Sequence, residues 1–449
     1  MGFKSGLSSS VAVDSSGTNP PSATPALEVL RESPPNLADP RWGLKLDGVT
    51  DDGPAFNAIA GIKTLWLPDG KNLFFSTPLA VPSGTVLLMG AKAQLTCGVT
   101  TAVNGITLDH GAAIKSWNLS YDTTNDGPLV FAAAACVTAA LIANKHTDGT
   151  QESAYVEGIS INGNTTGGAT SGDGILLDSL FVNTSVRHVD TFHCSGYGLH
   201  TKASGVGVGL GAAFFEDVNA FGNSLDQILV EQAFQALTFE DVNVQALAAG
   251  HHGLHLNGTA GGSSNRVNIR NLYCENGVAN AAALLINNVD GALVDGVYMG
   301  QARQSGQAVV RITGTTYMVE LRNLYSITLQ AGDVIVDDQT NARQVLALFN
   351  PAMCNHYDTE AGKVAAAQVG GSLPAVPATN TAFTNPFGWD QTVYITAAAG
   401  GSTTVQSAAG STIVAIPAST TLAVDWPTGV PYKLIYGAGN APTWQWVAR

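Results

Sequence analysis

A short pattern repeats along residues 155 to 330 and limits the fold more than any other feature of the chain. Each copy has an apolar residue, two polar residues and a second apolar residue. The second apolar residue returns every 24 to 30 positions. Periods of ~20–50 residues are typical of repeat architectures. The second apolar residues are Ile159, Val189, Val218, Val242, Leu272, Val297 and Leu324.

A second alternating strand follows most copies of this pattern, at 198–200, 228–230, 253–256, 284–286 and 309–312. The repeat unit is therefore strand, turn, strand. It lacks the Leu-rich frame of leucine-rich repeats and the four strands of a propeller blade. We predict an all-β fold, a right-handed parallel β-helix whose strands stack ~4.8 Å apart. Val, Ile, Leu and Phe fill its interior, and polar side chains form columns outside.

The flanking segments differ in composition from the repeat. Residues 1–40 are rich in Ser, Pro and Gly and predict an extended arm or attachment segment. The solenoid is predicted over 41–355, a linker over 356–382, and a small antiparallel β domain over 383–449 that holds four of the seven Trp. Because the ends of a solenoid must be covered, this domain is expected to cap one end.

A capping helix is predicted near residue 53, at the other end. Asp51 or Asp52 can cap it, Pro54 stands in its first turn, and Phe56 and Ile59 share one face.

Composition excludes several classes of protein. With 20 Lys and Arg against 34 Asp and Glu, the net charge is -14, which argues against a nucleic-acid partner. The longest apolar run, 129–143, is too short for a membrane span. No secretion signal is expected at the start.

The cysteines argue against two further kinds of site. The five cysteines stand far apart in the sequence without a Cys-x-x-Cys pair, so we expect neither a disulfide framework nor a zinc ribbon. Cys194 and Cys274 are predicted to be core thiols.

Two stretches resemble a known family. Asp47-Gly48-x-x-Asp51-Asp52, Leu65-Trp66-Leu67-Pro68-Asp69-Gly70, Leu79-x-Val81-Pro82-Ser83-Gly84 and Val86-Leu87-Leu88-Met89-Gly90 follow in order within about 45 residues. They resemble the opening of pectate-lyase-superfamily proteins that include phage tailspikes. Gly53 stands where that family usually has Thr, and the aromatic residue expected near 72–73 is absent. The end, from 384–387 to Trp444-Gln445-Trp446, is similar to the small β domain of phage tail proteins.

The resemblance implies an elongated homotrimer on the virion tail that acts at the bacterial surface. Its partners would be a bacterial surface polysaccharide, two further copies of the chain, and the phage tail or baseplate, bound through the N-terminus. No membrane insertion is expected. The Trp-rich C-terminal domain is the predicted trimerisation domain, because exposed aromatic surface needs a partner.

Hydrolysis of a polysaccharide needs two carboxyl groups on one groove. Alignment of the repeats puts Glu216 beside Glu240, and Asp217 beside Asp241. These acids are candidate catalytic residues, although they also fit solvated turn residues of a repeated frame. On the second strand, one column holds Asp173, Tyr197, Asp226 and His252, and another holds Asp178, Lys202, Glu231 and Asn257.

We predict Asp226 and Glu231 as the leading catalytic pair, with Glu240 third, followed by Asp241 and Glu216. The predicted sugar-binding residues are Tyr197, His200, Lys202, His252 and His255. A uronate lyase would instead use Tyr197, His200, Lys202 or His255 with Arg270 as the group that neutralises the substrate carboxylate. A tail protein that binds the glycan without cutting it also remains open.

The motif His251-His252-x-x-His255 resembles a metal site. Strand alternation is expected to turn His252 and His255 to opposite faces, and no Glu lies between them. We therefore predict no metal and no cofactor, and an endo-glycosidase as the leading function.

Overall fold

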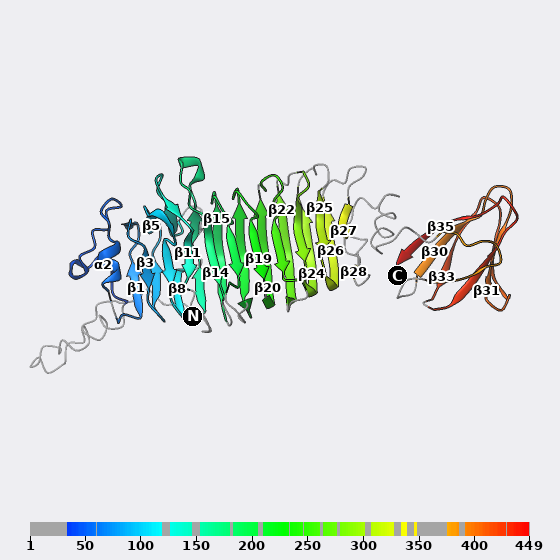
Figure 1. Cartoon of the computed structure of the whole chain (residues 1–449), viewed down its shortest axis with the longest axis horizontal. Coiled ribbons are helices and arrows are strands. Elements are labelled where there is room, and N and C mark those ends of the chain that lie inside the picture. The colour runs from blue at the N-terminus through cyan, green and yellow to red at the C-terminus, as the bar shows by residue number, and fades with distance from the viewer. Residues whose placement is uncertain are drawn as a thin grey trace, which may run out of the picture.

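The computed structural model describes residues 34–59, 61–118, 126–145, 153–179, 183–204, 210–232, 234–245, 247–260, 264–275, 279–300, 307–326, 334–338, 345–347, 375–385, 391–427 and 429–448. Two stacks of parallel strands run side by side through its larger part (Figure 1). Both stacks are parallel throughout, so this part is a parallel β-solenoid, as the repeat predicts.

The first stack, sheet A, is 16-stranded. Its central path is β1 (Thr64–Leu67), β4 (Val86–Met89), β8 (Ala112–Ser116), β12 (Ala154–Glu157), β15 (Ser185–Phe192), β18 (Phe214–Phe221), β20 (Phe234–Gln245), β22 (Asn265–Glu275), β24 (Asp290–Met299), β26 (Tyr317–Ser326) and β28 (Val345–Ala347). Shorter members pair beside it: β2 (Asn72–Phe75), β5 (Gln94–Cys97), β9 (Leu129–Ala132), β13 (Ser160–Asn162) and β17 (Leu210–Gly211).

The second stack, sheet B, has ten strands. They are β3 (Leu79–Val81), β7 (Ile106–Leu108), β11 (Ala140–Asn144), β14 (Asp173–Asp178), β16 (Leu199–Lys202), β19 (Ile228–Gln232), β21 (Leu254–Gly258), β23 (Ala282–Asn287), β25 (Ala308–Thr313) and β27 (Val334–Asp338). A separate pair joins β6 (Thr100–Val103) and β10 (Val137–Thr138), and short 3-10 helices lie at η1 (Pro40–Trp42) and η2 (Thr165–Gly167).

The repeat predicted from sequence matches the strand register. Val189 is the partner of Val218, Leu272 of Val297, and Val297 of Leu324. On sheet B, Leu199 pairs with Ile228, which in turn pairs with Leu254. The predicted apolar residues therefore form continuous columns from one strand to the next.

A left-handed residue explains why two apolar residues three apart both point inward. In a regular strand, positions i and i+3 face opposite sides. Here the residue just before each second apolar position has a positive φ, which bends the strand and returns its next side chain to the core. Asn271, for example, has φ +55°. Gly, Asn and Asp tolerate this conformation best, which accounts for their recurrence there. The column is Gly158, His188, Asp217, Asp241, Asn271, Gly296 and Asn323.

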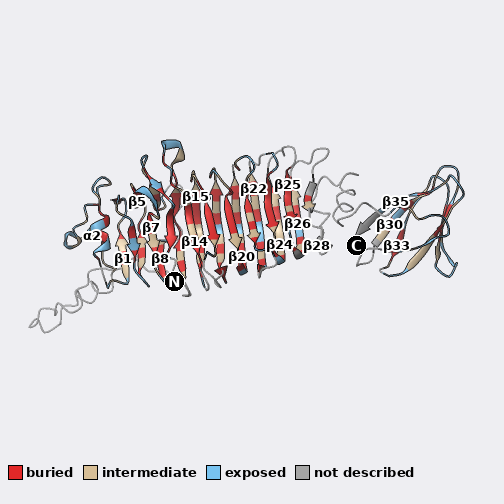
Figure 2. Cartoon of the chain, in the orientation of Figure 1, coloured by how far each residue is buried: buried red, intermediate tan, exposed pale blue. Residues whose placement is uncertain are grey.

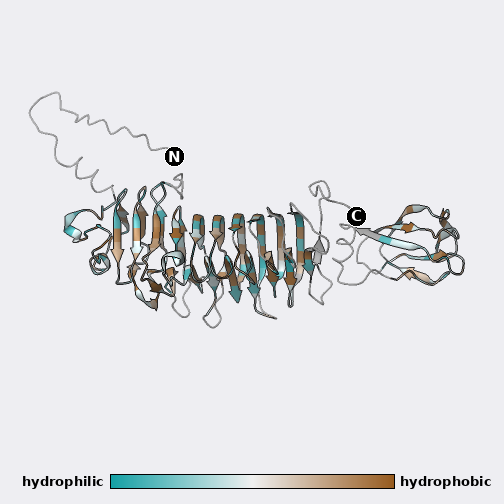
Figure 3. Cartoon of the chain, turned by 90° about the horizontal axis from the view of Figure 1, so that it is seen from above, coloured by the Kyte–Doolittle hydropathy of each residue, from teal (hydrophilic) through white to brown (hydrophobic). Residues whose placement is uncertain are grey.

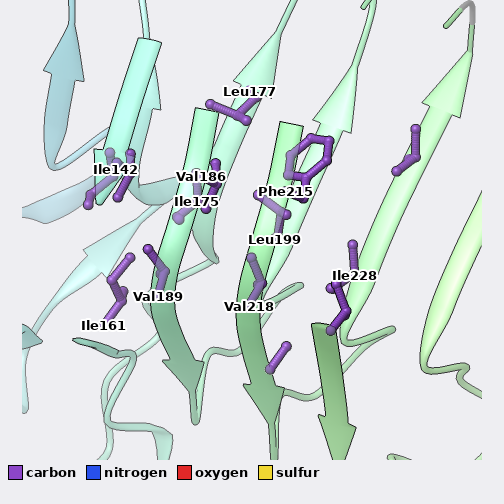
Figure 4. Packing of buried hydrophobic residues seen from close by; sticks show 14 of the residues in the cluster. Ile142, Ile161, Ile175, Leu177, Val186, Val189, Leu199, Phe215, Val218 and Ile228 are labelled. Carbon is purple, nitrogen blue, oxygen red and sulfur yellow. The ribbon is translucent and has the colours of Figure 1, made fainter. Parts of the chain in front are cut away.

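The core is an unbroken ladder of aliphatic and phenyl side chains between the sheets. Figure 4 shows Ile175, Leu199 and Ile228 of sheet B facing Val186, Phe215 and Val218 of sheet A, and all six are fully buried. Figure 2 shows buried positions alternating with partly exposed ones along the strands, and Figure 3 shows polar and apolar residues interspersed in the same way. Full burial of such a side chain contributes about 1.5–3 kcal/mol.

A short helix, α2 (Gly53–Asn57), lies at the β1 end of the solenoid (Figure 1). Phe56 and Ile59 are 1% and 7% exposed, as their shared face predicts. Asp51 accepts a hydrogen bond from the N–H of Gly53, the first helical residue. Asp52 instead accepts bonds from the backbone N–H groups of Lys45 and Leu46. The two acids thus fix the chain at the start of the helix and in the segment before it.

The C-terminal domain is antiparallel, as predicted. One sheet has β29 (Ala382–Thr384), β34 (Pro431–Ile435), β31 (Thr403–Ser407) and β32 (Thr412–Ile416), and the other has β33 (Thr421–Trp426), β30 (Gln391–Thr396) and β35 (Thr443–Ala448). Trp426 is fully buried and contacts the rings of Phe383, Tyr432 and Trp444. Of the predicted linker, 356–374 lies outside the described residues, as do 348–355 at the end of the predicted solenoid. In the described part of the linker, the Pro377 carbonyl accepts a hydrogen bond from the Tyr436 hydroxyl.

Two cysteines that are far apart in sequence lie together. Cys97 and Cys136 are buried free thiols whose Sγ atoms lie 3.6 Å apart, a contact that their sequence spacing does not predict. Cys194 and Cys274 are buried core thiols, as predicted, and burial raises the pKa of Cys274 to about 12. Cys354 lies outside the described residues.

Within the described residues, no helix has the length and apolar character needed to cross a bilayer.

Candidate functional site

The outer face of sheet B collects most of the predicted site residues. Along β16, Leu199 and Thr201 are buried in the interior, so His200 and Lys202 point outward. The register pairs Asp178 with Lys202, and Glu231 with Asn257, as the alignment of repeats predicted. Lys202 is engaged there, with its Nζ 4.0 Å from Asp178.

Asp173 orients a histidine on the next strand, β16, and a tyrosine just before that strand. Its Oδ1 accepts a hydrogen bond from the Tyr197 N–H at 3.0 Å, and its Oδ2 lies 2.8 Å from Nδ1 of His200. The rings of Tyr197 and His200 are in contact, with centroids 4.6 Å apart. Because one carboxylate binds both residues, the imidazole is held in one orientation.

Glu231 contacts the other nitrogen of the same imidazole. Its Oε1 lies 3.1 Å from Nε2 of His200. With Nδ1 donating to Asp173, a hydrogen bond between Nε2 and Glu231 needs one more proton, held by either the imidazole or the carboxyl group. The three side chains therefore share a transferable proton. Glu231 is the most accessible of the three, with 28% of its side chain exposed.

Asp226 repeats this arrangement farther along the sheet. Its Oδ1 accepts from the His252 N–H at 2.6 Å, and its Oδ2 lies 2.8 Å from Nδ1 of His255. His251 approaches Oδ1 at 3.5 Å. Burial alone would raise the pKa of Asp226, but the hydrogen bonds from His255 and His252 outweigh it and hold that pKa below its usual range. Asp226 is thus an enclosed carboxylate.

The local potential is negative around Tyr197. Burial raises the pKa of its phenol, and the carboxylates of Asp226, Glu231 and Asp173 raise that pKa further. All three acids therefore act on one hydroxyl group. The phenol stays protonated and can donate a hydrogen bond to a bound molecule.

His252 is a neutral donor in this cluster. Its Nδ1 accepts the Ala282 N–H at 3.0 Å, so the neutral ring carries its proton on Nε2. Burial lowers the pKa of His252 to about 4. The ring centroids of His252 and His255 are 5.6 Å apart, so the expectation that they face opposite sides is wrong. The turn before β21 places them together. No group able to hold a metal ion is found in the described part of the chain.

The other candidate acids lie on sheet A. Glu216 binds Nε of Arg187 at 2.7 Å, and Glu240 lies 4.0 Å from Arg270. By the strand register, these residues belong to one column of charged side chains that crosses sheet A. The column is Lys115, Glu157, Arg187, Glu216, Glu240, Arg270, Asp295 and Arg322. Glu216 and Glu240 are therefore engaged in ion pairing.

Asp241 accepts a hydrogen bond from Asn271, and Asp217 lies 2.9 Å from His188. Both acids belong to the left-handed column of sheet A. They stand apart from the sheet B cluster, as does Arg270, the arginine of the lyase hypothesis.

The structure thus brings together Asp226, Glu231 and all five predicted sugar-binding residues, and separates them from Glu216, Glu240 and Asp241. Sequence reasoning placed Asp173 in the correct column but missed its role as the partner of His200. The signal was the repeated Gly-Leu-His at 198–200 and 253–255, each preceded by an Asp 27 or 29 residues earlier.

No family model matches the sequence, and a search of curated proteins finds no match. Solved structures do match the backbone. The enzymatically active domain of bacteriophage CBA120 tailspike protein 2 has 8% identity and a TM-score of 0.44, over 90% of this chain and 74% of that one. A capsular polysaccharide depolymerase tailspike from Acinetobacter baumannii bacteriophage Fri1 has 11% identity and a TM-score of 0.37, over 81% and 78%.

The A-module of an Azotobacter vinelandii mannuronan C-5 epimerase has 13% identity and a TM-score of 0.42, over 71% and 99%. The structural neighbours therefore include phage tailspike depolymerases and polysaccharide-active β-helix enzymes. At these values the likeness concerns the backbone and carries no activity over to this chain.

Proposed function

We propose that the chain is a tailspike-type depolymerase that cleaves a bacterial surface polysaccharide by hydrolysing internal glycosidic bonds at the sheet B face. The observation that carries this proposal is the contact between Glu231 and His200, within a cluster that also holds Asp173 and Asp226. This rigid face carries carboxyl groups, which can cleave a glycosidic bond. It also carries imidazoles and a phenol, which can form hydrogen bonds with sugar hydroxyls.

The charge of the cluster favours hydrolysis over elimination. Glycoside hydrolysis passes through a positively charged, oxocarbenium-like transition state. The carboxylates of Asp226 and Asp173 near Tyr197 stabilise developing positive charge there. A lyase builds negative charge next to a uronate carboxylate, which the same acids would oppose. Arg270, the residue suggested to neutralise that carboxylate, pairs with Glu240 on sheet A instead.

Glu231 is the proposed general acid, because it is accessible and shares a proton with His200. It would protonate the oxygen of the leaving sugar as the bond breaks. Tyr197 and His252 would donate hydrogen bonds to sugar hydroxyls. The negative face also favours a glycan that is neutral at the cleaved linkage.

The direct test is to incubate the protein with purified capsules, exopolysaccharides and O-antigens from a panel of bacteria and to follow polymer size by chromatography. We expect at least one polymer to shorten, with new reducing ends. If a polymer binds to the immobilised protein but is never shortened, the depolymerase proposal is wrong and the chain is a receptor-binding protein instead.

The homotrimer and the attachment of the N-terminus to the phage tail remain proposals based on the sequence resemblance. Two of the four Trp residues that suggested a trimer contact, Trp426 and Trp444, pack inside the C-terminal domain. Light scattering of the full chain tests the trimer, and a monomer mass of about 46 kDa would contradict it.

A further inference from the structure

The second Asp and His pair of sheet B differs from the first in one respect. Nε2 of His200 faces Glu231, whereas Asn287 holds the corresponding position next to His255. The register shows this, since His255 pairs with Leu285 two residues before Asn287. Asn287 donates to Asn257, and the described residues provide no hydrogen-bond partner for Nε2 of His255. This nitrogen is therefore available to a ligand.

The state of His255 follows from its partner. Asp226 is enclosed, with 8% of its side chain exposed, and its hydrogen bonds keep it ionised. Its Oδ2 accepts the proton on Nδ1 of His255, so the neutral ring has its lone pair on Nε2. An imidazole held in this way by a buried carboxylate is arranged as a general base.

His255 and Glu231 lie on one face at a spacing that suits two catalytic groups. His255 pairs with Leu229, two residues before Glu231. With strands ~4.8 Å apart and a rise of ~3.3 Å per residue, their Cα atoms are about 8 Å apart. This Cα spacing leaves the two side chains room to hold their reacting atoms at the ~6.5–9.5 Å that separates the two carboxyl groups of inverting glycosidases, a gap that a water molecule occupies.

From this geometry we infer that His255, positioned by Asp226, is the general base of an inverting hydrolysis in which Glu231 is the acid. The inference rests on the proposed function and assigns the second member of its catalytic pair. A water oxygen attacks the anomeric carbon and passes one proton to Nε2 of His255. The bond from that carbon to the leaving oxygen breaks, and this oxygen takes the proton of Glu231. One water is consumed for each linkage cut.

The test compares two histidines that each contact an aspartate. In His255→Asn the side-chain amide can still donate to Asp226 but has no group at the place of Nε2. The control is His188→Asn on sheet A, where His188 lies 2.9 Å from Asp217 and Asn suits the positive φ. We expect His255→Asn to lower kcat by ~100-fold or more with little change in KM. Both variants should unfold at the temperature of the parent, and the control should keep its activity.

A second measurement follows the anomeric configuration of the first product by NMR. We expect it to be inverted relative to the cleaved linkage. A retained configuration, or near-parent kcat for His255→Asn, overturns the assignment of His255 while polymer cleavage by the parent upholds the depolymerase. If the parent shortens no polymer, the proposed function fails, and this inference with it.

Discussion

Nε2 of His200 lies 3.1 Å from the carboxylate of Glu231, on the neighbouring strand of sheet B. Because Asp173 holds the opposite nitrogen of the ring, the imidazole can supply a proton to Glu231 and take one back. The most accessible acid of the cluster is therefore connected to a proton source, as a general acid requires.

Replacement of this acid gives the first prediction. We expect Glu231→Gln to lower depolymerase turnover by ~100-fold or more, since the leaving oxygen loses its proton donor. The amide keeps the size of the side chain, so the fold should remain. Release of reducing ends measures the effect. Glu320→Gln serves as the matched control, because Glu320 pairs with Arg322 on sheet A. Equal rates for both variants would remove Glu231 from the mechanism.

The acids of sheet A should affect stability rather than catalysis. Glu216 and Glu240 are partly exposed and ion-paired, and exposed pairs contribute about 0–1 kcal/mol. We expect Glu216→Gln and Glu240→Gln each to lower the free energy of unfolding by at most about 1 kcal/mol and to leave turnover near that of the parent. Urea unfolding and the reducing-end assay check this. A large loss of turnover with unchanged stability would return these two residues to the catalytic set.

The left-handed column gives a prediction about the fold. Asn271 has φ +55° and donates to Asp241. Asn271→Gly and Asn271→Val both lose that hydrogen bond and both must adopt the left-handed backbone, which is unstrained for Gly but costs Val roughly 1–2 kcal/mol. We expect the Val variant to be the less stable by that amount in urea unfolding. If the Gly and Val variants unfold alike, the bend at this column does not depend on the left-handed residue.

Much of the fold could be predicted from the sequence because it depends on local rules. The strand bend needs a left-handed residue between two apolar residues, and Gly, Asn or Asp holds that position in six of the seven copies, with His188 in the other. Parallel stacking then fixes which residues share a column, and the alignment of repeats correctly paired Asp178 with Lys202 and Glu231 with Asn257. Contacts between side chains that are not register partners were harder to predict. His200 reaches Asp173 on one neighbouring strand and Glu231 on the other, and this depends on side-chain rotamers that no spacing reveals.

The turn at 251–253, just before β21, was also not predicted from the sequence. Strict alternation would separate His252 from His255, yet 251–253 lie outside the strand, and the Asp226 carboxylate draws both residues to one side. Cys97 and Cys136 illustrate the same limit, because their contact depends on how loops join successive turns of the solenoid.

Burial of His252 predicts a pH dependence of stability. Its pKa is about 4 in the folded chain, below the ~6.5 of an unfolded histidine. As the pH falls from about 6.5 toward 4, the unfolded chain binds a proton at this histidine that the folded chain does not bind. The free energy of unfolding therefore falls across this pH window, and above the window it does not change with pH through His252. We expect His252→Asn, whose side-chain oxygen can still accept the Ala282 N–H, to weaken this dependence. Urea unfolding at several pH values measures it, and identical pH profiles for parent and variant would contradict the assignment.

The chemistry of bond cleavage tests the central claim most directly. A susceptible polysaccharide is digested in water labelled with heavy oxygen, and the products are weighed by mass spectrometry. Hydrolysis at the Glu231 face predicts one labelled oxygen at each new reducing end and saturated sugars at each new non-reducing end. Unlabelled ends accompanied by unsaturated sugars that absorb ultraviolet light would contradict it and identify a lyase.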